Sequence, residues 1–206
     1  MRSGAAKCPH LQCLYQSVCD HCDVAIVEGI IVNVGPQLAV RGKEEIDLDN
    51  AVLVPGFIDA HVHIESSMLR PTEFARLILS KGTTTIVADP HEIANVCGLD
   101  GIRFMLKDAK NAAVDIRFML PSCVPAMPFE TSGATLTADE LRSLIDEPDV
   151  SGLAEVMNVP AVLSGDNEML EKLTMAHVAH KHIDGHAPML EGDGLSAYVT
   201  AGVSSD

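Results

Sequence analysis

Basic residues are scarce in this chain. Lys and Arg number 14 against 29 Asp and Glu among 206 residues, and the formal net charge at pH 7 is −15. A negative field of this size repels phosphate backbones and anionic membrane surfaces, so the sequence argues against partners of either kind. Apolar runs are short as well, since none reaches the roughly 18 residues that span a bilayer, and the start lacks the apolar stretch of a secretory signal. We therefore expect a cytoplasmic protein.

Internal repeats and low-complexity segments are also missing, so neither changes the interpretation of the chain. The chain is 47% hydrophobic and 21% charged, a composition typical of one ordinary globular domain with or without a small appendage. Its length allows a sizeable core.

Four of the six cysteines lie within the first 22 residues, at Cys8, Cys13, Cys19 and Cys22. Without a secretory signal we expect thiols in a reducing compartment. The pair Cys19 and Cys22 has the spacing of zinc ligands, but only five residues separate it from the earlier pair, too few for a usual zinc knuckle. We interpret these cysteines as incidental thiols and leave the zinc site as the alternative.

The chain divides by pattern into three segments. Residues 1–21 form a Cys-rich start that matches no element pattern. Residues 22–54 hold β-rich runs at 24–27, 30–34 and 51–54 with Gly-containing turns, which indicates part of a small β-sheet domain. Residues 55–206 alternate apolar strands with amphipathic helices, and we count strands near 54–63, 83–89, 115–121, 150–157 and 182–186, with a sixth from 203.

This strand–helix alternation predicts an α/β fold with a parallel sheet, and we favour an incomplete (β/α)8 TIM-like barrel over a doubly wound sheet. The spacing of Phe74, Leu77 and Ile78 predicts one buried helix face. The segment from Thr137 to Glu140 fits a capping box, so we expect a helix to begin there.

The sharpest motif is Pro-Gly-Phe-Ile-Asp-Ala-His-Val-His at 55–63. Alternate residues of a strand point to one face, so His61 and His63 can offer nitrogens to a single ion at the mouth of a barrel. A bare His-x-His would favour ordinary loop histidines. The surrounding sequence strengthens the interpretation as a metal site.

The 55–63 motif resembles the first-strand motif of the amidohydrolase superfamily. Further segments at 63–69, 88–96, 120–126, 152–158 and 183–188 resemble the N-terminal part of its adenine deaminase family, in sequence and in order, over roughly residues 20 to 206. The family implies hydrolytic deamination of adenine to hypoxanthine and ammonia, by attack of a metal-activated hydroxide on C6, in purine salvage or catabolism. Its partner is the small molecule adenine, and a homo-oligomer stays open.

By position, the resemblance implies that His61, His63 and His186 are metal ligands and that Glu155 is the carboxylate bridging a binuclear divalent metal site. The family favours Mn or Fe over Zn, and imidazoles with carboxylates suit these ions. The alternative for Glu155 is a salt-bridged core carboxylate, although an unpartnered acid at a buried strand end is costly.

Asp89, His91 and Glu92 follow the second predicted strand. They could bind substrate, hold a further metal or orient a ligand, or they could form a turn with a polar rim. Residues 65–67 could shape the pocket or cap the next helix. We interpret His177 and His180 as solvated surface histidines.

The resemblance also implies a sixth-strand His ligand and an eighth-strand Asp as the main acid/base, and neither is present in the 206 residues. We therefore expect the chain to stop inside strand 6 and to have no appreciable deaminase activity alone. Two alternatives remain open. One is another cyclic amidohydrolase, of the dihydroorotase, hydantoinase or deacetylase type, although many of these place a Lys where Glu155 lies. The other is a non-catalytic truncated protein.

Overall fold

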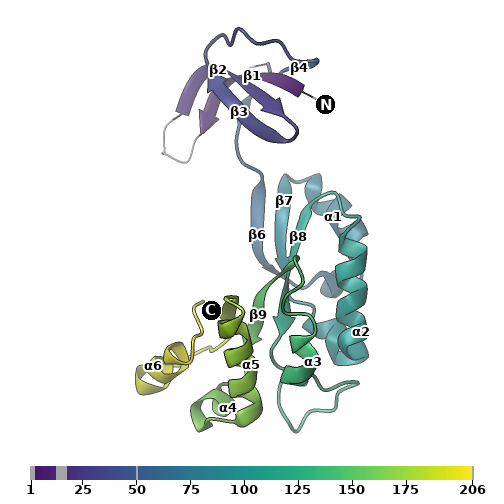
Figure 1. Cartoon of the computed structure of the whole chain (residues 1–206), viewed down its shortest axis with the longest axis vertical. Helices are drawn as coiled ribbons and strands as arrows, with labels where there is room; N and C mark the ends of the chain where they lie inside the picture. Colours follow the sequence, from purple (N-terminus) through teal and green to yellow (C-terminus); the bar gives the residue numbers. More distant parts are fainter. Residues whose placement is uncertain (1–2, 13–17, 50, 206) are drawn as a thin grey trace. The chain divides into compact units, whose positions relative to one another are not determined.

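The computed structural model describes residues 3–12, 18–49 and 51–205. The chain divides into two compact units, Met1–Gly56 and Phe57–Asp206 (Figure 1). Within the described residues, no helix combines the length and the apolar character needed to cross a bilayer.

The first unit is a small β-sheet. Its strands are β1 (Ser3–Gln12), β2 (Val18–Val27), β3 (Ile30–Gly35), β4 (Glu44–Asp47) and β5 (Val52–Leu53). They run in the order β3-β2-β1-β4, and β5 also pairs with β1. Strands β2 and β3 form an antiparallel hairpin, and the predicted runs at 24–27 and 30–34 lie within them. The sequence patterns did not predict strands β1 and β4.

Cys22 is buried in this unit and is disulfide-bonded. The expectation that it is a free thiol was therefore wrong, and a disulfide sulfur cannot serve as a zinc thiolate. The side chains of Cys8, Cys13 and Cys19 lie outside the described part of the chain.

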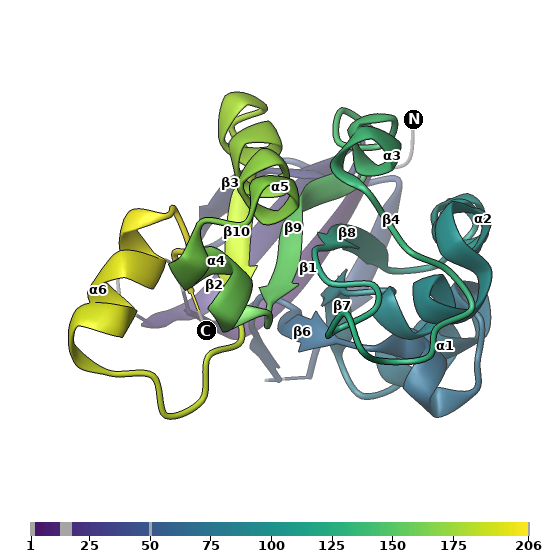
Figure 2. The ribbon, with the colours of Figure 1, turned by 90° about the horizontal axis from the view of Figure 1, so that it is seen from below.

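The second unit is a curled parallel sheet covered by helices on its outer side (Figures 1 and 2). Its strands lie in chain order: β6 (Phe57–Val62), β7 (Thr83–Ala88), β8 (Asp115–Pro121), β9 (Val150–Val156) and β10 (His182–Gly185). The helices are η1 (Ile64–Ser67), α1 (Pro71–Leu79), α2 (His91–Ala109), α3 (Ala138–Arg142), α4 (Val159–Ser164), α5 (Asn167–Val178) and α6 (Gly192–Thr200).

This arrangement is a partial (β/α) barrel and confirms the predicted fold class. Five of the predicted strands are present, and a parallel bridge between Asp184 and Ser205 lies where the sixth was expected. Every strand pair is parallel, so the carboxyl ends of all five strands lie at one rim.

The core lies between the sheet and its helices. Ile86, Phe118 and Leu153 from three neighbouring strands are fully buried. The predicted face of α1 is confirmed for Phe74 and Ile78, which pack against the core. It was wrong for Leu77, which is 54% exposed, whereas Ala75 is fully buried. Helix α1 begins at Pro71 and turns the i, i+4 pair of Pro71 and Ala75 inward, which leaves Leu77 on the outer side.

Strands β9 and β10 approach each other closely at Gly152. A Cβ atom at this position would lie 2.1 Å from the carbonyl oxygen of His182, so no larger residue fits. Three residues later the backbone of Glu155 adopts φ 20°, which turns the chain sharply at the end of β9. The amide of Met157 donates to the carbonyl of Glu155 at 2.7 Å and closes this turn.

The capping box at the start of α3 is confirmed. The Thr137 hydroxyl accepts a hydrogen bond from the Glu140 amide, and the Glu140 carboxylate accepts one from the Thr137 amide at 2.8 Å. This backbone hydrogen bond lowers the pKa of Glu140 below its ordinary value.

Replacing Glu140 with Gln tests the capping box through pH. The carboxylate has a lower pKa in the folded chain than in the unfolded chain, so its contribution is present above the unfolded pKa and is lost as pH falls through the folded one. We expect E140Q to cost about 0.5–1 kcal/mol at pH 7 and to flatten the loss of stability below about pH 4.5, measured by urea unfolding at several pH values. Asp139→Asn, in the same turn, is the control. An unchanged acid slope in E140Q would contradict the prediction.

Candidate metal centre at the carboxyl ends of the strands

Glu155 lies buried at the centre of four imidazoles. Its Oε1 atom lies 3.7 Å from His61 Nε2 and 3.4 Å from His186 Nδ1. Its Oε2 atom lies 3.5 Å from His63 Nε2 and 3.4 Å from His91 Nδ1. The two oxygens of one carboxylate therefore face two different pairs of histidines.

His61 and His63 come from the end of β6, as the 55–63 motif predicted. Their Nε2 atoms lie 3.2 Å apart, and His63 Nδ1 lies 3.0 Å from the carbonyl oxygen of Asp89. A carbonyl only accepts, so this contact assigns the proton to Nδ1 of His63 and leaves the Nε2 lone pair directed at Glu155. A lone pair facing a carboxylate oxygen at this distance requires a proton or a cation between them.

Asp89 and His91 follow strand β7 and join the same group. Asp89 is 2% exposed, and its Oδ2 atom accepts a hydrogen bond from His91 Nδ1 at 2.7 Å, which raises the pKa of His91. Its other oxygen, Oδ1, is buried with no hydrogen-bond partner among the described residues. Burial, and next the negative charge of Asp89, raise the pKa of Glu155.

Donor atoms of His63, Asp89, His91 and Glu155 all lie within 4.8 Å of one another. Two imidazoles and two carboxylates are a donor set that suits Mn, Fe or Zn. The unpartnered Asp89 oxygen and the two adjacent buried carboxylates fit a cation at this position, because a positive charge would satisfy both. The structure thus places Asp89 and His91 in one group with Glu155 and His63. The resemblance had not included Asp89 and His91 among the metal ligands.

Asp184 is a neighbour of the site that sequence reasoning missed. Its Oδ2 atom lies 3.5 Å from His61 Nδ1, and its Oδ1 atom accepts a hydrogen bond from the Ser205 hydroxyl at 2.7 Å. The available signal was its place two residues before His186, since alternate residues of a strand share a face.

Ser122 and Lys172 hold the backbone of Glu155 in place through two successive hydrogen bonds. The Ser122 hydroxyl donates to the Glu155 carbonyl at 2.8 Å. The Lys172 ammonium, from α5, donates to the Ser122 carbonyl at 3.0 Å, and burial lowers the pKa of this lysine. Neither residue carried a sequence signal, because each acts through contacts between segments far apart in the chain.

The other candidates lie outside the metal-ligating group. Glu92 accepts a hydrogen bond from the Ser66 hydroxyl, and Glu65 accepts one from the Ile93 amide at 3.1 Å. Burial raises the pKa of Glu65. Residues 65–67 do not cap α1, whose N-cap makes no side-chain hydrogen bond. His177 is exposed on α5, as expected for a solvated surface residue.

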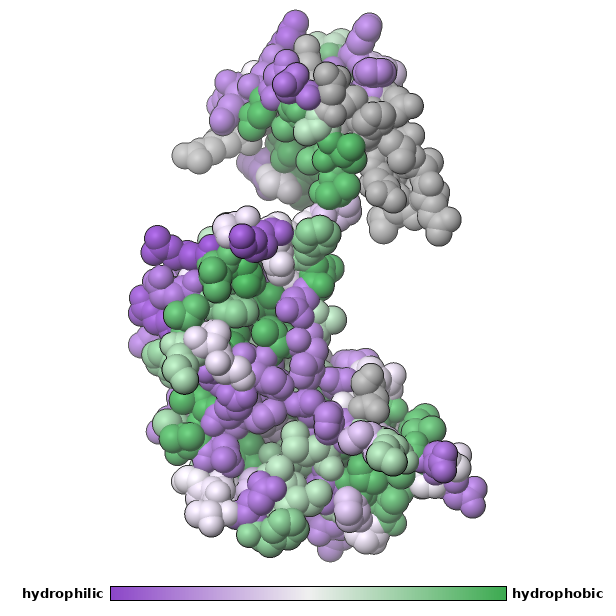
Figure 3. Space-filling model, turned by 180° about the vertical axis from the view of Figure 1, so that it is seen from behind, coloured by the Kyte–Doolittle hydropathy of each residue, from purple (hydrophilic) through white to green (hydrophobic). Residues whose placement is uncertain are grey.

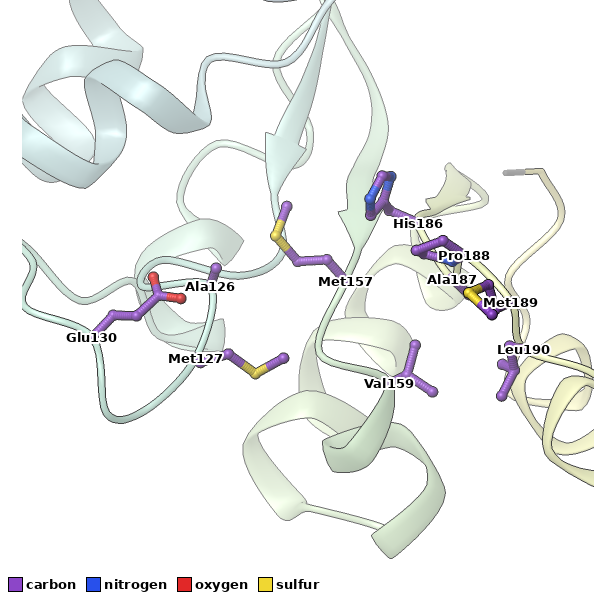
Figure 4. A pocket seen from close by; sticks show the side chains of 10 residues that line it. All are labelled: Ala126, Met127, Glu130, Met157, Val159, His186, Ala187, Pro188, Met189 and Leu190. Atoms are coloured by element: carbon purple, nitrogen blue, oxygen red, sulfur yellow. The ribbon is translucent and has the colours of Figure 1, made fainter.

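A pocket of about 460 Å³ opens beside His186 (Figure 4). Its walls come from the loops after β8, β9 and β10, and its lining is mainly apolar, with Met127, Met157 and Val159 among the contributors. Glu130 adds a carboxylate. One face of the second unit also carries a hydrophilic band flanked by apolar surface (Figure 3).

The amidohydrolase family model matches residues 52–206. Among curated relatives, an adenine deaminase of Clostridium acetobutylicum is 55% identical over 184 residues, which are 89% of this chain and 32% of that protein. An adenine deaminase of Archaeoglobus fulgidus is 52% identical over the same lengths and shares. The chain thus spans about a third of the length of these relatives.

A solved structure with the same fold is an atrazine chlorohydrolase of Arthrobacter aurescens TC1 complexed with zinc. It is 16% identical, with a TM-score of 0.68, and the match covers 95% of this chain and 55% of that chain. This likeness shows the fold, and the family match rests on sequence over three quarters of the chain. The chain belongs to the amidohydrolase family and is homologous to adenine deaminases.

Proposed function

We propose that this chain contributes an N-terminal, metal-binding part of an adenine deaminase, which hydrolyses adenine to hypoxanthine and ammonia. The main support is the geometry of Glu155, because its two oxygens face separate pairs of histidines at 3.4–3.7 Å. The relatives at 52–55% identity, named adenine deaminases, support the choice of reaction.

We propose two divalent cations at this site, Mn or Fe ahead of Zn, and the four histidines that face the two oxygens of Glu155 support this proposal. On one side, His61 and His186 would hold an ion with Glu155 Oε1. This proposal departs from the prediction that His61 and His63 bind a single ion, because their Nε2 atoms face different oxygens of Glu155. On the other side, His63, His91 and Asp89 would hold one with Glu155 Oε2, and this ion would replace the proton that His91 Nδ1 donates to Asp89. Divalent cations supply Lewis acidity, which lowers the pKa of water so that it becomes a nucleophile near neutral pH.

The residues around the ligands fix their orientation. The Asp89 carbonyl holds the ring of His63, and Asp184 lies against the second nitrogen of His61. Such partners select the tautomer and keep the ligating nitrogen aimed at the ion. Asp89 would thus serve twice, with its side chain as a ligand and its backbone as an anchor.

The pocket beside His186 is the proposed position of the purine ring. Its apolar lining suits the flat faces of a heteroaromatic ring, and thioethers such as those of Met127 and Met157 make favourable contacts with aromatic rings. The Glu130 carboxylate can accept a hydrogen bond from a ring N–H. His186 belongs both to this pocket and to the group around Glu155, so a ring bound here would lie beside the proposed metal centre.

Metal stoichiometry tests the proposed division of ligands. We expect the unmodified chain to bind about two Mn²⁺ per molecule, measured by equilibrium dialysis. His186→Ala and His91→Ala should each remove one ion, because they lie on opposite sides of Glu155. Glu155→Ala should weaken both ions by more than about tenfold, since it removes a shared ligand.

His177→Ala provides the matched control, because it removes an exposed imidazole of α5 that is not one of the four histidines facing Glu155. It should leave the Mn²⁺ stoichiometry unchanged. Retention of both ions at full affinity by the Glu155→Ala chain would rule out a shared carboxylate.

A chimera tests the reaction itself. The aligned 184 residues of this chain would replace the matching segment of the Clostridium acetobutylicum relative. With Mn²⁺ we expect the chimera to convert adenine to hypoxanthine, followed by chromatography. Glu155→Gln in the chimera should lower the rate by at least about 100-fold, because loss of a ligand should exceed the 10–100-fold typical of outer partners.

Dihydroorotate and an N-acetylated amino sugar are the comparison substrates. A folded chimera that hydrolyses either of these and leaves adenine intact would favour another amidohydrolase reaction over the proposed one.

A further inference from the structure

Tyr198 joins the ends of two strands that carry proposed metal ligands. Its hydroxyl donates to the Val156 carbonyl at 2.5 Å and accepts from the His186 amide at 3.2 Å. Val156 directly follows Glu155 in the chain. One phenol oxygen therefore contacts the backbone next to the shared carboxylate and the backbone of a facing histidine.

The Tyr198 hydroxyl lies where the backbone pairing between β9 and β10 ends. Strands β9 and β10 pair up to Gly185 and Val156, and their register shifts between Ile183 and Gly185. His186 lies one residue past this last pair. The His186 amide would otherwise lack a fixed partner on β9, so the Tyr198 hydroxyl takes the place of the next backbone hydrogen bond between the two strands.

The local sequence makes room for this contact. A Cβ atom at Gly185 would lie 2.8 Å from the Tyr198 hydroxyl oxygen, so a side chain there would displace the hydroxyl. Tyr198 is 2% exposed and is the buried residue of α6, whose residues are all described. Leu195 and Val199 on the same helix are 42% and 56% exposed, so α6 is anchored mainly through this one ring.

We propose that Tyr198 is a positioning residue that sets the distance between His186 and Glu155 for the cation on the His186 side. The inference rests on the proposed metal centre. It does not extend to the other side of Glu155, because His63 directly follows β6, Asp89 directly follows β7 and His91 begins α2. The tyrosine should therefore affect one of the two ions.

Co²⁺ is a suitable probe, since its visible absorption reports the ligand geometry. In the 206-residue chain, Tyr198→Phe keeps the buried ring and removes only the hydroxyl. We expect it to weaken one Co²⁺ by about tenfold and to shift the absorption of that ion, the scale of change seen on losing an outer partner. Thr200→Val is the control, because it removes another α6 hydroxyl that donates to a carbonyl, that of Ser196.

Double variants separate positioning from a merely structural role. In a His91→Ala background, where the His186-side ion remains, Tyr198→Phe should still weaken and shift Co²⁺. In a His186→Ala background it should change neither quantity. A Tyr198→Phe chain that melts at a lower temperature but keeps its Co²⁺ affinity and spectrum in the His91→Ala background would overturn the inference.

Failure of the metal centre gives a different result, because the unmodified chain would then bind no Co²⁺, which overturns the proposed function and this inference together. Should Tyr198→Phe not fold, hydrogen exchange in the unmodified chain carries the test. We expect the His186 amide to exchange slowly and to slow further with Zn²⁺, and rapid exchange in both states would overturn the proposal.

Discussion

The site depends on one buried carboxylate held at the end of a strand. Glu155 occupies a backbone conformation with φ 20°, where non-glycine residues carry strain of order 1–3 kcal/mol. The Ser122 hydroxyl and the Met157 amide both bond its carbonyl and keep it there. Because the carboxylate points into the rim, histidines from separate strands can reach its two oxygens. Without this turn, His61 and His186 would share no partner.

The buried negative charges of this group explain why it favours a bound cation. Asp89 and Glu155 are two buried carboxylates close together, and burial with mutual repulsion raises the pKa of Glu155. The imidazoles around the two carboxylates offset part of the free-energy cost of burying these charges only when they are protonated. His63 donates its Nδ1 proton to the Asp89 carbonyl, so its Nε2 atom presents a lone pair to Glu155. A divalent cation would satisfy the carboxylates and the imidazoles together, which links the fold of this unit to metal chemistry.

Much of this architecture could be predicted from the sequence. Strands buried in a parallel sheet are continuous apolar runs, so 83–89, 115–121 and 150–157 matched the observed β7, β8 and β9 closely. His61 and Glu155 lie in the last residues of β6 and β9, and His63 and His186 directly follow β6 and β10. The structure brings all four together. Ser122 and Tyr198 could not be predicted, because their roles arise from the curl of the sheet and from contacts across many residues. Asp184 was missed, although its place two residues before His186 on a strand was an available signal. The outward turn of Leu77 depended on where α1 begins, which helical spacing alone does not fix.

The most direct test of the shared carboxylate is anomalous diffraction from crystals of the chain grown with Mn²⁺, recorded at the manganese absorption edge. We expect two peaks about 3.5–4 Å apart, one on each side of Glu155. One should lie beside His61 and His186 and the other beside His63, His91 and Asp89. A single peak, or peaks with no Glu155 oxygen between them, would contradict the central claim.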